Sequence, residues 1–231
     1  MTDAHRLPEA VLWDLDGTLV DGERLWEIAH REVARGLRGT LGAWALRRLV
    51  GADLETSVAV LLAETGHAAT PESVTRTREQ LLAAVAALYA GGVTWMPGAH
   101  DALHAVRDAG IPTALVTNTT RRVADLALDA MGREHFDVTV CADEVASGKP
   151  SPEPYLRAAA LLGVDPARCV AVEDSPDGAL AARRAGAAVL IVPGAVPVPG
   201  GVGRVHLPSL AGFDPADLAG PDLGGSTALT G

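Results

Sequence analysis

Two amino acids are almost missing from this chain of 231 residues. It has one lysine, Lys149, against 18 arginines, and one asparagine, Asn118. A composition that avoids lysine and asparagine this strongly indicates codon bias. The two positions that keep these residues are therefore the first to consider for a function that arginine or another polar residue could not perform.

Cysteines, an excess of positive charge and long apolar runs are also scarce or absent. Cys141 and Cys169 each lie in a short apolar run, so we expect buried thiols and no disulfide framework. A formal charge of −10 argues against a nucleic-acid or polybasic membrane surface. No apolar run approaches the roughly 18 residues of a membrane span, and the N-terminal residues do not resemble a signal peptide. We expect a cytoplasmic protein that binds neither nucleic acid nor membrane.

Short apolar runs alternate with helical stretches over much of the chain. Four of the helical stretches are followed by a glycine, which is typical of the position just after a helix. The alternation predicts an α/β fold, with a doubly wound, Rossmann-like parallel sheet covered by helices on both faces. The expected strands are 10–13, 113–116, 138–141, 169–172 and 188–192, and the expected helices are 100–109, 121–131, 153–162 and 177–185.

One connection is too long to be a simple crossover. Residues 22–92 show helical periodicity without a convincing strand, and a structureless loop of this length would be unusual. We expect an inserted all-helical cap domain over 22–92 and a catalytic core formed by 1–21 and 93–231. The helices of the cap are expected at 23–36, 41–49, 53–64 and 71–89. An irregular tail of the core is expected from about residue 212.

Polar residues follow the expected strands at the points where they end. In an open parallel sheet, ligands bind outside these carboxyl ends. Several carboxylates gathered there repel one another and favour a divalent cation, and oxygen ligands suit Mg²⁺. A cation, a lysine and a hydroxyl beside a carboxylate nucleophile would make a phosphoryl-transfer site. The residues concerned are Asp14, Asp16, Thr117, Asn118, Lys149, Glu173 and Asp174.

Four segments carry a family resemblance, and they occur in the order and spacing of that family. The first segment, Asp14-Leu-Asp16-Gly-Thr-Leu-Val-Asp21, follows an apolar strand, and Thr117-Asn118 follows another. The third is Ser-Gly-Lys149-Pro-Ser-Pro, and the fourth is Val-Glu173-Asp174-Ser-Pro-Asp-Gly. Together they resemble the motifs of the haloacid dehalogenase superfamily of phosphohydrolases. The helical insertion resembles the cap of the subgroup that contains β-phosphoglucomutase and phosphoglycolate phosphatase.

The resemblance implies a role for each matching residue. Asp14 would attack phosphorus and form an aspartyl-phosphate, while Asp16 would protonate the leaving oxygen and then activate water. Thr117 and the amide of Asn118 would hold phosphate oxygens, and Lys149 would neutralise both the nucleophile and the phosphate. The implied Mg²⁺ ligands are the Asp14 side chain, the Asp16 main-chain oxygen and Asp174, with Glu173 as a further ligand or acting through a water. Asp21 is expected to be a structural hydrogen-bonding partner.

Residues outside these motifs leave alternatives open. Arg47 and Arg48 form either an exposed cationic helix end or a contact for an anionic substrate, since specificity positions of the subgroup lie nearby. His100 and His104, one helical turn apart, would suit a metal pair, but no third ligand is evident. We therefore expect them to be surface or packing residues.

Several reactions fit the same core motifs. We expect an Mg²⁺-dependent phosphatase that acts on a small phosphorylated metabolite as a monomer. A sugar phosphomutase is the alternative, although its subgroup tends to carry a histidine where this chain has Trp26. The branch of dehalogenases replaces the second aspartate of the first motif, so Asp16 argues against that activity. A non-catalytic regulator is disfavoured because every catalytic position is filled.

Overall fold

The computed structural model describes residues 7–219 and divides the chain into two compact units. A sheet unit contains the described parts of 1–20, 95–118 and 133–231, and a helical unit contains 21–94 and 119–132. Residues 1–6 and 220–231 lie outside the described residues. Most of the N-terminal segment and the end of the expected irregular tail therefore also lie outside them. The grouping places 119–132 with the helices, whereas the sequence assigns them to the core. The domain boundaries expected from the sequence stay a prediction.

The sheet unit is a parallel sheet of six strands in the order β3-β2-β1-β4-β5-β6. Its strands are β1 (Ala10–Trp13), β2 (Thr113–Val116), β3 (Val138–Val140), β4 (Cys169–Glu173), β5 (Ala188–Ile191) and β6 (Arg204–His206). The four strands β1, β2, β4 and β5 are buried along their whole length, as expected of a sheet covered on both faces. The predicted α/β fold with a doubly wound parallel sheet is confirmed.

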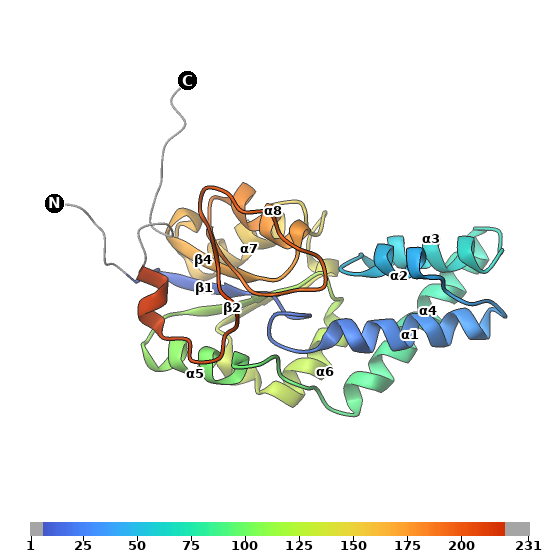
Figure 1. Ribbon diagram of the computed structural model, residues 1–231, viewed down its shortest axis with the longest axis horizontal. Coiled ribbons are helices and arrows are strands. Elements are labelled where there is room, and N and C mark those ends of the chain that lie inside the picture. Colours follow the sequence, from blue (N-terminus) through green and yellow to red (C-terminus); the bar gives the residue numbers. More distant parts are fainter. Residues whose placement is uncertain (1–6, 220–231) are drawn as a thin grey trace, which may run out of the picture. The chain divides into compact units, whose positions relative to one another are not determined.

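Helices lie on both sides of this sheet. In Figure 1, α7 (Glu153–Leu162) and α8 (Pro176–Ala185) lie on one side and α5 (Ala99–Asp108) lies on the other. Alternate strand residues such as Leu12 and Ala171 join buried residues of α7 and α8 in one apolar core. Short 3-10 helices complete the unit: η1 (Arg133–His135), η2 (Ala142–Glu144), η3 (Pro166–Arg168) and η4 (Pro215–Ala219).

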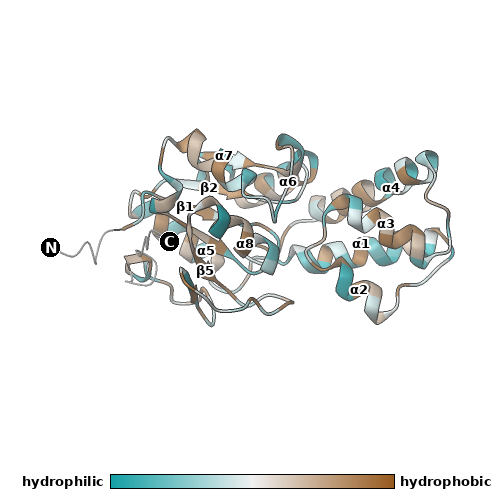
Figure 2. Ribbon diagram, turned by 90° about the horizontal axis from the view of Figure 1, so that it is seen from above, coloured by the Kyte–Doolittle hydropathy of each residue, from teal (hydrophilic) through white to brown (hydrophobic). Residues whose placement is uncertain are grey.

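The helical unit contains α1 (Gly22–Gly36), α2 (Ala43–Leu49), α3 (Leu54–Glu64), α4 (Pro71–Ala90) and α6 (Arg121–Met131). Helix α4 packs against α1, α3 and α6. It begins with a capping box in which Thr70 and Ser73 bond to each other's backbone N–H, which satisfies amides that a helix start leaves free. Figure 2 shows hydrophobic and hydrophilic stretches alternating along the helices of this unit, the pattern of helices that bury one face.

Two segments differ from expectation near the C-terminal end. Strand β6 was not expected, because Arg204 and His206 are polar and the strand is only partly buried at the edge of the sheet. The tail expected to be irregular contains η4, whose Leu218 is buried. Pairing of β6 with one neighbour, β5, explains why no apolar run marks it in the sequence.

Candidate active site

The three central strands end at the same level, which brings the residues that follow them together. In the register of the sheet, Trp13 lies between Leu115 of β2 and Val172 of β4. The backbone N–H of Asp14 continues this pairing by donating to Val172 O at 3.0 Å. The first and fourth motifs are therefore neighbours in space although about 160 residues separate them.

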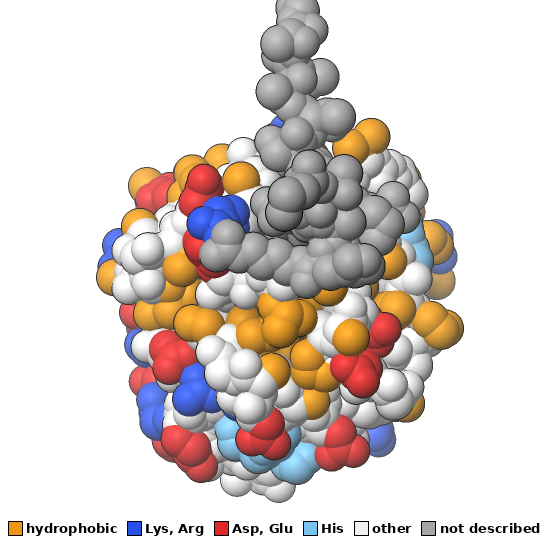
Figure 3. Space-filling view, turned by 90° about the vertical axis from the view of Figure 1, so that its left-hand side faces the viewer, with side chains coloured by type: hydrophobic (Ala, Val, Ile, Leu, Met, Phe, Trp, Pro, Cys, Tyr) orange, Lys and Arg blue, Asp and Glu red, His pale blue; other side chains and the backbone are white. Residues whose placement is uncertain are grey.

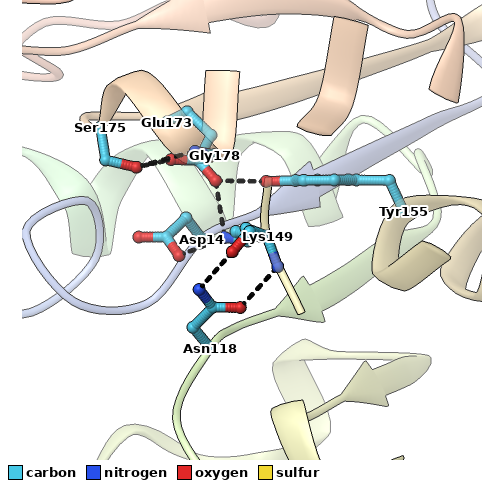
Figure 4. Close-up of polar contacts among 7 residues, drawn as sticks. All are labelled: Asp14, Asn118, Lys149, Tyr155, Glu173, Ser175 and Gly178. Atoms are coloured by element: carbon cyan, nitrogen blue, oxygen red, sulfur yellow. Dashed lines mark hydrogen bonds and ion pairs between the residues drawn. The ribbon is translucent and has the colours of Figure 1, made fainter. Parts of the chain in front are cut away.

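Lys149 lies at the centre of the polar residues at this edge. It comes from the segment between β3 and α7, and its ammonium Nζ is 2.5 Å from Oδ1 of Asp14 and 2.6 Å from Oε1 of Glu173. Figure 4 shows the lysine between these carboxylates. All three side chains are buried. Charge-assisted hydrogen bonds of this length fix the direction of the ammonium group.

Asn118 holds the backbone of the same lysine. Its side-chain Nδ2 donates to Lys149 O at 3.2 Å, and its Oδ1 accepts from the Lys149 backbone N–H at 2.8 Å (Figure 4). The side-chain amide thus bonds to both backbone polar groups of one residue, Lys149. Sequence reasoning gave weight to the amide N–H of Asn118, whereas the structure assigns a clear task to its side chain.

Glu173 accepts hydrogen bonds from several protein donors. Besides Lys149, the Tyr155 hydroxyl donates to Oε1 at 2.5 Å and the Ser175 hydroxyl donates to Oε2 at 3.0 Å. Gly178 of α8 lies against this carboxylate, and a Cβ there would overlap it (Figure 4). These contacts favour Glu173 as the group that orients Lys149. Its predicted role as a metal ligand stays untested.

Tyr155 is a site residue that sequence reasoning missed. It lies in the first turn of α7, its ring is 5.2 Å from Lys149 Nζ, and its side chain is fully buried. Burial and the charge of Glu173 raise the pKa of its hydroxyl well above the usual value, so Tyr155 stays a hydrogen-bond donor. A tyrosine six residues after the lysine, in an aromatic-poor chain, was the only available signal.

The electrostatics of the site follow from its burial. Burial raises the pKa of Asp14 to about 7, Lys149 opposes this shift, and Glu173 adds to it. Burial alone would lower the pKa of Lys149, but Asp14 and Glu173 outweigh it and raise the pKa above the ordinary value. The lysine therefore stays charged, and the acidic residues around it still outnumber it.

Asp174 completes a group of three buried acids. Oxygen atoms of Asp14, Glu173 and Asp174 lie within 4.8 Å of one another. Gly17 has φ +90°, and a Cβ at that position would overlap the Asp174 carboxylate. The glycine is required both by its backbone conformation and by this close approach. Three oxygen donors with an excess of negative charge suit a divalent cation.

The remaining predicted residues lie on the same edge. Asp16 is half-buried and belongs to the turn in which the Gly17 N–H donates to Val20 O at 2.8 Å. Thr117 is buried, and its backbone N–H donates to Val140 O at 3.0 Å. Together with the residues above, the sheet brings all seven predicted core residues to one edge.

Arg47 and Arg48 belong to the helical unit. Both are exposed in the last turn of α2, and the guanidinium carbon of Arg48 lies 5.0 Å from the centre of the Trp44 ring. Their contact with a substrate stays a prediction. Asp21 precedes α1 and its N–H donates to Thr94 O at 2.8 Å, without a side-chain capping bond.

Comparisons with known proteins agree with the motifs. A family model described as haloacid dehalogenase-like hydrolase matches residues 8–186. The chain belongs to this family. Hexitol phosphatase A of Escherichia coli is 34% identical over 192 residues, covering 78% of this chain and 81% of the relative. A phosphorylated carbohydrates phosphatase of Thermotoga maritima is 32% identical over 179 residues, covering 77% and 82%.

A solved structure extends the similarity to the whole fold. CbbY from Rhodobacter sphaeroides in complex with phosphate has a TM-score of 0.77 and 30% identity, covering 94% of this chain and 99% of that one. The predicted family and the predicted enzyme class, a phosphoric monoester hydrolase of this family, are confirmed. Among residues 7–219, no helix combines the length and apolar character needed to cross a bilayer. The cytoplasmic location and the monomeric state stay predictions.

Proposed function

We propose that this hydrolase removes phosphate from a small phosphorylated carbohydrate through an aspartyl-phosphate on Asp14, with Mg²⁺ as its cation. One observation carries the proposal: the buried Lys149 ammonium lies 2.5 Å from the Asp14 carboxylate, at the carboxyl ends of the central strands. A cation at this place can neutralise an attacking carboxylate and the phosphate that approaches it. The names of the curated relatives support the carbohydrate class.

The residues present fit a divalent cation. Asp14, Glu173 and Asp174 bring carboxylate oxygens within 4.8 Å of one another in a buried place, and such hard oxygen donors are preferred by Mg²⁺. Asp14 and Asp174 would hold the cation together with the Asp16 main-chain oxygen. When bound, Mg²⁺ would offset the negative charge of the acids and of the phosphate.

In the first step, one carboxylate oxygen of Asp14 forms a bond to phosphorus while the bond from phosphorus to the carbohydrate oxygen breaks. Asp16, as the acid, gives its proton to that leaving oxygen, which departs as an alcohol. Lys149 keeps its ammonium between Asp14 and Glu173 and so stays beside the transferred phosphate. Thr117 would donate its hydroxyl to a phosphate oxygen.

In the second step, water attacks phosphorus and the bond between phosphorus and the Asp14 oxygen breaks. Asp16, now a carboxylate, takes a proton from the water, which restores both aspartates and releases inorganic phosphate. Asn118 contributes by holding the backbone N–H and C=O of Lys149 through two hydrogen bonds, which keeps the ammonium in place during both steps.

A panel of sugar, sugar-alcohol, glycolate and nucleotide phosphates, assayed for phosphate release with and without Mg²⁺, tests the proposal. We expect release from carbohydrate phosphates that depends on the metal. Asp14→Asn should abolish turnover while circular dichroism shows a folded chain, because an amide is not a nucleophile of comparable strength. Activity retained in that variant would remove Asp14 from its proposed role.

The phosphomutase alternative has a different product. A mutase would convert β-glucose 1-phosphate to glucose 6-phosphate without releasing phosphate. The curated relatives described above are named phosphatases, and Trp26 stands where that subgroup tends to have a histidine. Conversion of this sugar phosphate alone, with no phosphate release from any other substrate, would overturn the hydrolase proposal.

A further inference from the structure

Three histidines gather on the surface of the sheet unit, away from the residues assigned above. His100 and His104 lie on α5, and His135 ends η1. The ring centres of His100 and His104 are 4.4 Å apart, and so are those of His104 and His135. Figure 3 shows pale-blue histidine side chains gathered on this face, with acidic side chains beside them. We call these three residues the histidine cluster.

The sequence shows His100 and His104 as a pair without an evident third ligand, and we expected surface or packing residues. The structure places a third histidine, His135, beside His104. His100 and His104 are four residues apart on one helix, so their side chains share a face. His135 follows 31 residues after His104, and η1 packs against α5. No local sequence pattern connects the three residues, because the contact depends on how the chain returns to the sheet between α6 and β3.

The backbone around His135 is held firmly. The Thr113 hydroxyl donates to His135 O at 2.5 Å, and the Thr113 N–H donates to the Asp137 carboxylate at 2.9 Å. Arg107 of α5 donates to the same carboxylate at 2.6 Å. These bonds tie η1 to the start of β2 and to α5, so His135 reaches the other two rings from a fixed backbone.

The chemistry of the cluster favours binding of a soft or borderline cation. A neutral imidazole offers a nitrogen lone pair to a metal, and metal binding displaces the proton from a charged ring. His100 Nδ1 lies 3.0 Å from Oδ1 of Asp101. With the proton on Nδ1, the ring donates to this carboxylate and leaves Nε2 as a ligand atom, the arrangement common at zinc sites.

We propose that His100, His104 and His135 form a binding site for a transition metal of the Zn²⁺ type, separate from the acidic cluster. Imidazole nitrogens suit Zn²⁺, Cu²⁺ and Ni²⁺, whereas Mg²⁺ takes oxygen ligands, so the two clusters select different ions. The His100 and His104 rings are tilted by 46° to each other, and the His104 and His135 rings meet edge to face at 69°. Binding therefore requires rotation of the imidazoles about their side-chain torsions. His100 is exposed and gives a metal access to the cluster.

A bound metal would link α5 to η1. Its ligands would come from two elements that are far apart in sequence, so binding stabilises the folded sheet unit relative to the unfolded chain. The expected consequence is a rise in the melting temperature on addition of Zn²⁺, even when Mg²⁺ is already saturating. This consequence does not depend on the proposed phosphatase activity.

Calorimetric titration of the untagged full chain with ZnCl₂, in the presence of excess Mg²⁺, tests the proposal. We expect one Zn²⁺ per chain, and His104→Ala should weaken that binding by at least ~10-fold because the central ring is lost. His100→Ala changes an exposed ligand and should weaken binding without affecting folding. Co²⁺ in place of Zn²⁺ should give visible absorption bands in the wild type that both variants lose.

Two controls separate this site from other sources of zinc binding. His67→Ala removes a histidine of the helical unit, where His67 contacts Thr65, and should bind Zn²⁺ like the wild type. Asp174→Asn disables the acidic cluster and should also leave this binding unchanged. Loss of all Zn²⁺ binding in Asp174→Asn, or unchanged binding in both His100→Ala and His104→Ala, would overturn the proposal.

Discussion

Lys149 in the sheet unit and His30 in the helical unit are both buried basic side chains, and they respond to burial in opposite directions. Two carboxylates within 2.6 Å of Lys149 raise its pKa and keep it charged. His30 lies in α1 with its Nε2 lacking any hydrogen-bond partner among the described residues, and burial lowers its pKa to about 4. Burial favours the neutral form of a basic group. The two close carboxylates reverse this at Lys149, whereas the charge of Glu27 does not reverse it at His30.

The difference shows which part of the molecule holds a buried charge in a fixed position. Around Lys149 the polar groups are connected: Asn118 bonds to the Lys149 backbone, and the Lys149 ammonium and the Tyr155 hydroxyl both donate to Glu173. In the helical unit, the buried hydroxyls of Ser57 and Thr77 lack a hydrogen-bond partner within residues 7–219, as His30 Nε2 does. A connected network holds a charge in a defined place, which catalysis needs. Isolated buried polar groups define no such place.

The largest expected effect comes from replacing the only lysine. Lys149→Arg keeps the positive charge but puts a planar guanidinium where a compact ammonium fits between two carboxylates. We expect kcat to fall by about 100- to 1,000-fold, as when one charge-stabilising group is removed from an active site. Turnover of a generic aryl phosphate with Mg²⁺ measures this.

A matched substitution on the surface serves as the control. Arg168 pairs with Glu9 at 2.6 Å on the exposed side of the sheet unit. Arg168→Lys should leave kcat unchanged, since an exposed ion pair adds little stability. Near-normal kcat in Lys149→Arg would show that any cation at position 149 suffices. That result would contradict the proposed need for a compact ammonium between the two carboxylates.

The second effect concerns stability and pH. At pH 7 His30 is neutral in both the folded and the unfolded chain. As pH falls below 6.5 the unfolded chain takes up a proton that the folded chain refuses until about pH 4. Stability therefore falls between these values, by up to roughly 3 kcal/mol from this group alone. Urea unfolding at pH 7, 5.5 and 4 measures it.

Comparison with a variant isolates this contribution from the carboxylates that also titrate. His30→Leu should show a smaller loss of unfolding free energy between pH 7 and pH 4 than the wild type. His67→Leu, which changes an exposed histidine of the same unit, should keep the wild-type dependence. Identical pH dependence in His30→Leu and the wild type would mean that the folded chain protonates His30 as readily as the unfolded chain does.

Sequence reasoning found the central sheet and the acids at its edge because both depend on local signals. An apolar strand followed by Asp14 and Asp16, or by Thr117, is visible in a few consecutive residues. Strand β6 lacks such a signal, since at the edge of the sheet Arg204 is only half-buried and His206 is exposed. His135 and the side-chain role of Asn118 depend on contacts over 31 residues, which periodicity and composition do not encode.

The smallest expected effect tests the outer part of the lysine network. Tyr155→Phe removes one hydroxyl and leaves Oε1 of Glu173 with Lys149 as its single donor in the described part of the chain. Leaving a buried acceptor less satisfied costs about 1–3 kcal/mol, and we expect kcat to fall about tenfold as Glu173 and Lys149 shift. Steady-state kinetics over a range of pH measures this.

Tyr89 provides the matched control for that change. It is buried in α4 of the helical unit, so Tyr89→Phe removes the same atom from a comparable environment. That variant should keep the wild-type kcat and pH profile, even if its stability changes. If Tyr155→Phe lowers only the melting temperature and leaves the kinetics intact, Tyr155 supports the fold alone. A changed pH profile of kcat in Tyr155→Phe, absent from Tyr89→Phe, would instead show that the hydroxyl acts through Glu173 on the charge of Lys149.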